Sequence, residues 1–136
     1  MKYYTKSGRE ISFLGAGERE DIDKFFGVLL KSWVKRDEDY DFDDDPAHNQ
    51  CTVTAMVVQD YFGGEIVTVK VGAGTHYLNQ IDGKLFDLTS DQFTSHGVEV
   101  DYRSPEIQDR EKVGMDGTAP ERYQKLKMNV EANLGK

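Results

Sequence analysis

The segment 49–93 constrains the fold more than any other part of the chain. Its first part, Cys51–Phe62, carries apolar residues at helical spacing and is closed by two glycines, which predicts a helix. Strand-like runs follow: first Glu65–Val71, then a run that carries His76, then one that carries Asp87. The sequence therefore predicts an α+β fold, in which helices pack on a small antiparallel sheet.

The only cysteine of the chain, Cys51, stands where this helix is expected to begin. Backbone N–H groups and the helix dipole at an N-terminus favour a thiolate over a thiol. An imidazole within reach can take up the thiol proton, and a third polar group can fix its tautomer. We therefore expect Cys51 to be a nucleophile, His76 its base and Asp87 the orienting group. The N–H of Cys51 and the side chain of Gln50 are the expected donors to an oxyanion.

The spacing of His76 and Asp87 supports their pairing. An Asp-Gly pair at 82–83, between alternating runs, predicts a hairpin with a two-residue turn. Ile81 then faces Lys84, and continuing the count leaves His76 and Asp87 as diagonal neighbours on one face, because the pleat has a period of two. The register therefore predicts that the imidazole and the carboxylate meet.

Several alternatives stay open at this point. His48, three residues before the thiol, is a rival to His76, whereas His96 is expected in a turn and Asn79 on the opposite face of the hairpin. A lone cysteine is often a small buried apolar residue. A zinc site is the other alternative, but one cysteine and two available histidines are fewer ligands than the four of a structural zinc site.

A resemblance to a known family is carried by three segments: Asn-Gln-Cys-Thr-Val-Thr-Ala-Met-Val-Val-Gln-Asp-Tyr-Phe-Gly-Gly-Glu-Ile (49–66), Gly-Thr-His-Tyr-Leu-Asn (74–79) and Asp-Leu-Thr-Ser-Asp-Gln-Phe (87–93). They resemble the bacterial YunG-like proteins, which are uncharacterised and look like a compact papain-like (NlpC/P60-related) fold. The resemblance covers roughly 33–93, and more loosely the Glu-Arg-Tyr sequence at 121–123. It implies that the family's Cys, His and Asp fall on Cys51, His76 and Asp87. Leu78 stands where the family tends to have an aromatic residue.

These observations lead to two functional hypotheses for one domain, 1–136. The first is a cysteine-dependent hydrolase or acyl-transferase acting on an amide, isopeptide or thioester bond, with no cofactor. The second is a catalytically inert papain-like scaffold that serves as an acidic binding or inhibitory module.

Composition narrows the classes of partner and the location. The net charge of −8 argues against binding to nucleic acid or to an anionic membrane, although a DNA mimic would also be acidic. No apolar run approaches the length of a membrane span, and the first residues lack the apolar core of a secretion signal. A single cysteine fits a reducing compartment, so we expect a cytoplasmic protein.

The segment 37–45 holds seven carboxylates in nine positions, which predicts an exposed loop. It lacks the spacing of a twelve-residue calcium loop, so solvation is the expected state of its carboxylates. Because the segment leads directly to Cys51, its field should oppose thiolate formation and attract a cationic substrate.

The remaining segments are expected to complete the α+β fold. An amphipathic helix is predicted from Glu18, with an apolar face that packs on the Cys51 helix and ends near Trp33, a core residue. Alternation at 98–102 predicts the last strand, the charged segment 103–118 a long loop, and 118–134 a helix with an apolar stripe that ends at Leu134.

Overall fold

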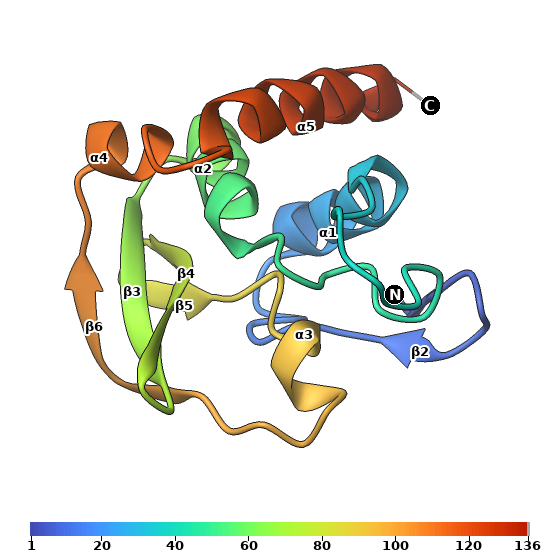
Figure 1. Cartoon of the computed structure of the whole chain (residues 1–136), viewed down its shortest axis with the longest axis horizontal. Helices are drawn as coiled ribbons and strands as arrows, with labels where there is room; N and C mark the ends of the chain where they lie inside the picture. The colour runs from blue at the N-terminus through green and yellow to red at the C-terminus, as the bar shows by residue number, and fades with distance from the viewer. Residues whose placement is uncertain (136) are drawn as a thin grey trace.

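The structure is a computed structural model that describes residues 1–135, and it is α+β as expected (Figure 1). Its helices are α1 (Glu20–Ser32), α2 (Cys51–Phe62), α3 (Asp91–Thr94), α4 (Arg110–Gly114) and α5 (Ala119–Leu134). Its strands are β1 (Tyr3–Tyr4), β2 (Glu10–Ile11), β3 (Glu65–Val71), β4 (Gly74–Ile81), β5 (Lys84–Phe86) and β6 (Asp101–Ile107). None of the helices in this range is long and apolar enough to cross a membrane.

The main sheet is antiparallel and has the strand order β5-β4-β3-β6. Ile81 faces Lys84 across the β4–β5 hairpin, which confirms the predicted register. The turn residues Asp82 and Gly83 both have positive φ, at 52° and 78°, as a two-residue turn of this kind requires. Asp87 follows directly after β5, so the chain turns away from the sheet at the carboxylate.

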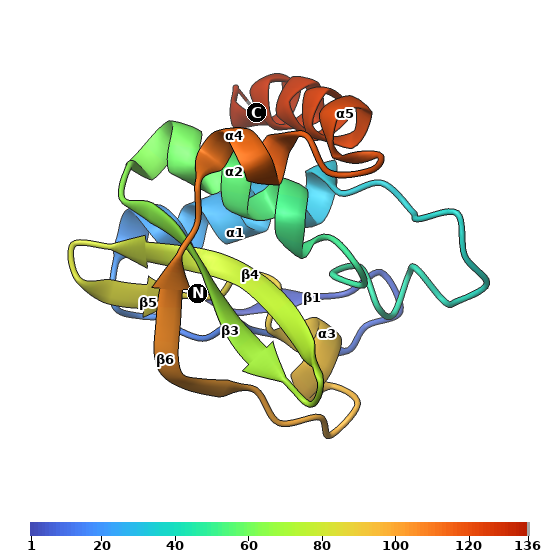
Figure 2. The same cartoon turned by 60° about the vertical axis from the view of Figure 1, so that its left-hand side comes forward.

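Helix α2 is the centre of the molecule, between β4 on one side and α5 on the other (Figure 2). Its residues from Val53 to Val58 are all buried, because partners cover it on most sides. The Asn79 amide donates to the Ala55 carbonyl at 2.9 Å and so ties β4 to the helix. This contact places Asn79 on the helix-facing side of the sheet.

Helix α1 contributes several large side chains to the apolar core that α2 also contributes to. Ile22, Phe26 and Leu29 are fully buried in the same apolar cluster as the valines of α2. Trp33 is also buried, and its indole N–H donates to Thr54 Oγ1 of α2 at 2.8 Å. The predicted packing of this helix and the core role of Trp33 are both confirmed.

The segment 103–118 is not the long loop that its composition predicted. Strand β6 extends to Ile107, and α4 follows from Arg110. Because β6 is an edge strand with mostly exposed side chains, it lacks the alternation by which strands are recognised. Pro105 is compatible with an edge strand. The apolar stripe of α5 also ends earlier than predicted, since Leu134 is 45% exposed.

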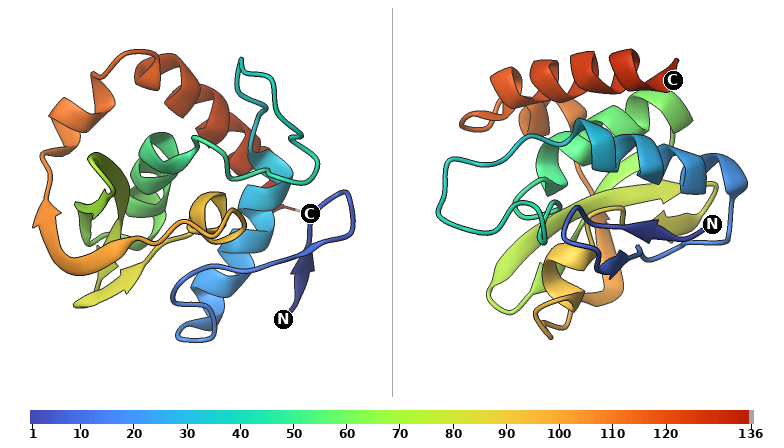
Figure 3. Two further views of the ribbon diagram at one scale, coloured as in Figure 1. Left: turned by 60° about the horizontal axis from the view of Figure 1, so that its bottom comes forward. Right: turned by 90° about the vertical axis from the view of Figure 1, so that its right-hand side faces the viewer.

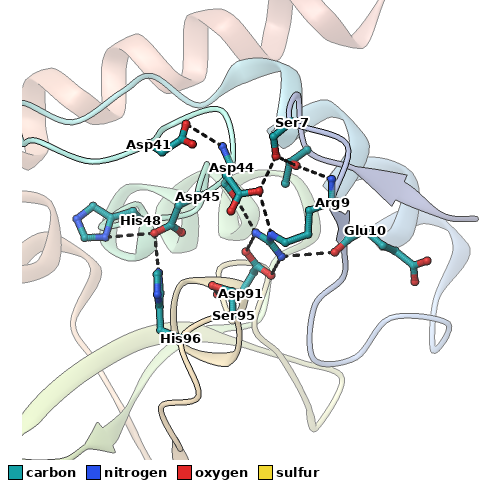
Figure 4. A network of polar contacts seen from close by, with 11 residues as sticks. Ser7, Arg9, Glu10, Asp41, Asp44, Asp45, His48, Asp91, Ser95 and His96 are labelled. Atoms are coloured by element: carbon teal, nitrogen blue, oxygen red, sulfur yellow. Dashed lines mark hydrogen bonds and ion pairs between the residues drawn. The ribbon is translucent and has the colours of Figure 1, made fainter.

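The acidic segment is only partly the solvated loop that was expected (Figure 4). Arg9 donates to the Asp44 carbonyl at 2.6 Å and binds both carboxylate oxygens of Asp91, at 3.0 and 2.8 Å. The Asp45 carboxylate, which is 13% exposed, accepts a contact from His96 Nε2 at 2.8 Å. The first half of the segment is exposed as predicted, but its last two carboxylates, of Asp44 and Asp45, contact Arg9 and His96.

Candidate active site

The imidazole of His76 and the carboxylate of Asp87 form a fully buried pair. His76 Nε2 lies 2.8 Å from Asp87 Oδ2, and both side chains are 0% exposed. Because a carboxylate only accepts hydrogen bonds, the proton of this bond belongs to Nε2. The two residues therefore meet as the hairpin register predicted, and Asp87 holds the ring in one orientation.

Asp87 is itself held from three other parts of the chain. The hydroxyl of Tyr102, on β6, donates to the same Oδ2 at 2.6 Å. Thr89 Oγ1 donates to Oδ1 at 3.4 Å, and the backbone N–H of Asp87 donates to the Leu14 carbonyl at 3.1 Å. Burial and the neighbouring carboxylate raise the pKa of Tyr102, so this phenol remains a proton donor. These contacts fix the Asp87 carboxylate in the position that His76 requires.

Cys51 begins α2 and is half-buried. The first turn of this helix carries no acidic side chain that would oppose a thiolate. Burial raises the pKa of the Cys51 thiol, but the nearby imidazole of His76 and the backbone N–H of Tyr77 lower it by more. The thiol pKa thus lies below its ordinary value, as a nucleophilic cysteine requires.

The same pairing acts on His76 in the opposite direction. Burial lowers the pKa of His76, whereas the hydrogen bond to Asp87 and the charges of Asp87 and Cys51 raise it, to about 9. Nδ1, on the ring side away from Asp87, is buried and makes no hydrogen bond of ordinary geometry within residues 1–135. Sulfur and ring are thus neighbours that are not aligned for a standard hydrogen bond, which is common in free enzymes. The arrangement favours a thiolate beside an imidazolium.

No carboxylate of the acidic segment is among the main groups that shift the Cys51 pKa. The expectation that this segment opposes thiolate formation therefore has no support in the geometry. Asp44 and Asp45 are paired with Arg9, His48 and His96 instead.

Gln50, the predicted oxyanion donor, is buried next to the thiol at the N-cap of α2. Its side-chain amide donates to the Val34 carbonyl at 2.7 Å. One amide hydrogen is therefore committed to the fold, and the second remains for an oxyanion. The role of Gln50 in catalysis stays a prediction.

The rival residues lie elsewhere. His48 Nε2 contacts Glu38 at 3.0 Å, and His96 contacts Asp45, so neither imidazole is paired with the thiol. Within the part of the chain that the structure describes, no group of three or more His, Cys, Asp or Glu residues is placed to hold a metal ion.

Sequence reasoning missed Tyr102 and two arginines near the thiol, Arg36 and Arg122. Tyr102 is the last residue of the alternating run 98–102, and this alternation places its side chain on the same face as the apolar residues of the run. The arginines come from the segment after α1 and the first turn of α5, and no periodicity relates these segments to Cys51.

Comparison with known proteins identifies relatives but no function. The family model described as YunG protein matches residues 21–135. A Bacillus subtilis (strain 168) protein described as "Uncharacterized protein YunG" is 35% identical over 100 residues, which cover 74% of this chain and 83% of that protein. No solved structure matches the chain.

Proposed function

This chain belongs to the YunG family, and we propose that it is a cysteine-dependent hydrolase or acyl-transferase acting on an amide, isopeptide or thioester bond. A papain-like (NlpC/P60-related) relationship is part of this proposal. It is supported by a thiol at the start of a central helix and a histidine on an antiparallel sheet beside it. The reduced thiol that this chemistry needs fits the cytoplasmic location inferred from the sequence.

The proposed reaction has two stages. The Cys51 thiolate attacks the carbonyl carbon, a C–S bond forms, and the carbonyl electron pair moves to oxygen. When the tetrahedral species collapses, His76 donates its proton to the leaving amine or thiolate, and an acyl-thioester remains on Cys51. Water or an acceptor nucleophile then gives a proton to His76, attacks the thioester and releases the thiolate. Asp87 keeps the imidazole oriented throughout.

The oxyanion of each stage needs donors near the start of α2. The backbone N–H of Cys51 lies in the first turn, where N–H groups have no partner within the helix. The second amide hydrogen of Gln50 is the other candidate. Removal of one such donor costs about 3 kcal/mol of transition-state stabilisation in other enzymes.

The observation that carries the proposal is the buried 2.8 Å bond between His76 and Asp87, next to a thiol whose pKa His76 lowers. A histidine that only fills the core would need neither a buried carboxylate partner nor a neighbouring thiol with a lowered pKa. The test is the rate of iodoacetamide labelling against pH, in wild type and in His76→Ala. Because the chain has one cysteine, the modification reports on one site.

The proposal expects wild type to react at a pH well below the pKa of an ordinary thiol, and His76→Ala to require a higher pH. If both proteins titrate like a free cysteine, the catalytic proposal is wrong. That result would support the alternative hypothesis, in which the protein is a catalytically inert scaffold that serves only for binding.

A further inference from the structure

The end of α1, the start of α2 and the start of α5 lie close together (Figure 3). Residues from these three segments line a pocket of about 280 Å³. Its apolar lining comes from Val34, Val53 and Leu126. Six of its other lining residues are charged, four of them basic and two acidic: Lys35, Arg36, Arg122 and Lys125 against Asp37 and Glu121. Its formal charge is thus 4 − 2 = +2, in a chain whose net charge is −8.

Two arginines converge beside this pocket on a single acceptor. Arg36 donates to the Asn49 carbonyl at 2.7 Å, and Arg122 donates to the same oxygen at 2.8 Å. Each guanidinium has five N–H donors, and within residues 1–135 neither makes an ion pair with a carboxylate. Two half-buried cations therefore lie close together, with most of their donors free.

The proximity of these charges has a measurable consequence. Burial and the charge of Arg36 lower the pKa of Arg122, whereas the charge of Cys51 raises it. An additional anion between the two guanidiniums would relieve their repulsion and use the free donors in the planar geometry that arginine offers. The contribution of Cys51 also shows that Arg122 is within electrostatic reach of the thiol.

The pocket lies beside the start of α2, where the candidate nucleophile stands. Gln50, the residue before Cys51, is part of its lining, and Asn49 carries the oxygen that both arginines share. Asn49 has a φ of 52°, and this left-handed turn directs its carbonyl to the arginines immediately before α2 begins.

We infer that this pocket, lined by Arg36 and Arg122, binds a carboxylate or phosphate group of the substrate that Cys51 attacks. The inference rests on the proposed function and specifies its substrate class: an acyl compound with an apolar part and an anionic group. It replaces the expectation of a cationic substrate, which depended on the acidic segment. The last carboxylates of that segment are occupied by Arg9 and His96.

The test compares two alkylating agents that differ in charge. Iodoacetate is anionic and iodoacetamide is neutral, and both react with the thiolate of Cys51. The ratio of their rates at one pH cancels any change in the thiolate fraction, so it isolates the attraction of the anion. We expect Arg122→Gln to lower the iodoacetate-to-iodoacetamide ratio about threefold, and Arg36→Gln/Arg122→Gln about tenfold, at low salt.

Two variants control for net charge and for folding. Arg103→Gln removes the same charge at an 88% exposed position on β6, and it should leave the ratio unchanged. Arg122→Lys keeps the charge and should keep most of the ratio, while circular dichroism verifies that each variant is folded. A ratio that is equal in wild type, Arg122→Gln and Arg103→Gln overturns the inference.

A second measurement does not depend on thiol chemistry. Wild type is titrated separately with succinate and with inorganic phosphate, and amide shifts are followed by NMR. Shifts at Gln50 and Arg122 that saturate in wild type and are lost in Arg122→Gln support the site, and the tighter anion identifies the group. No saturable shift with either anion overturns it. If His76→Ala does not affect labelling while an anion still binds, the catalytic proposal has failed and the pocket stands alone.

Discussion

Replacement of Asp87 by Asn is the most direct perturbation of the candidate site. The carboxylate is buried, and it is the largest influence that raises the pKa of His76. In Asp87→Asn the volume is kept but the negative charge is lost. Burial then dominates, so the imidazole becomes neutral at pH 7 and no longer stabilises a thiolate on Cys51.

The magnitude follows from the shift that the pair produces. A pKa of about 9 in place of 6.5 corresponds to about 3 kcal/mol of preference for the imidazolium, shared between Asp87 and Cys51. An ordinary thiol with a pKa of about 8.5 is only about 3% ionised at pH 7. If the wild-type thiol is mostly ionised, the variant should react with iodoacetamide about tenfold to thirtyfold more slowly at pH 7. At pH 10 the two rates should converge, because both thiols are then ionised.

The assay is the labelled fraction of the intact protein by mass spectrometry, as a function of time and pH. Asn79→Ala is the matched control. It removes a buried polar side chain of the same sheet, and that side chain binds the Ala55 carbonyl and not His76. It should lower the free energy of unfolding but leave the pH midpoint of labelling in place. If Asn79→Ala shifts the midpoint and Asp87→Asn does not, the assignment of the orienting residue is wrong.

Three other outcomes test the stability of the fold. In Cys51→Ser, Asp87 still holds the folded-state pKa of His76 above its unfolded value of 6.5, so the stabilisation is complete below pH 6.5 and is lost as the pH rises through that raised pKa. Urea unfolding should show a loss of about 1–3 kcal/mol between about pH 6 and about pH 9, and a flat profile would refute the pairing. Arg9→Met should lower the free energy of unfolding by about 3 kcal/mol, because it leaves the nearly buried Asp91 carboxylate unpaired. Gly64→Ala should lower the midpoint of thermal unfolding by several degrees, since its φ is 73° and a Cβ would collide with a carbonyl oxygen of β4, whereas an unchanged midpoint would contradict this geometry.

Local sequence patterns were sufficient to predict the helices and strands that bury one regular face. The apolar spacing of α1 and α2 and the turn at 82–83 each follow from short-range rules, and the structure agrees with them. Strand β6 fails those rules because it pairs with β3 through its backbone while its side chains remain exposed. Its pairing is decided by the edge of the sheet and not by its own composition.

In the candidate site, too, contacts within one local motif were predictable and contacts made by tertiary packing were not. His76 and Asp87 meet through one hairpin, so parity predicted their contact. Arg36 and Arg122 meet at Asn49 only because α5 packs on both α1 and α2, and such tertiary packing cannot be predicted from the spacing of the residues. The acidic segment misled for a related reason, since its counter-charge, Arg9, comes from a distant part of the chain.

The support of Asp87 by Tyr102 has a consequence for the order in which a newly made chain becomes reactive. Cys51, His76 and Asp87 are synthesised before Tyr102, and β6 can pair with β3 only after residue 107 has left the ribosome. Until then the carboxylate lacks one of its donors and the edge of β3 is open. A nascent thiol with an unperturbed pKa is mostly protonated and resists oxidation, because the thiolate is the form that oxidants attack. The last quarter of the chain, from Tyr102 onward, must therefore be synthesised before Asp87 has its full set of donors.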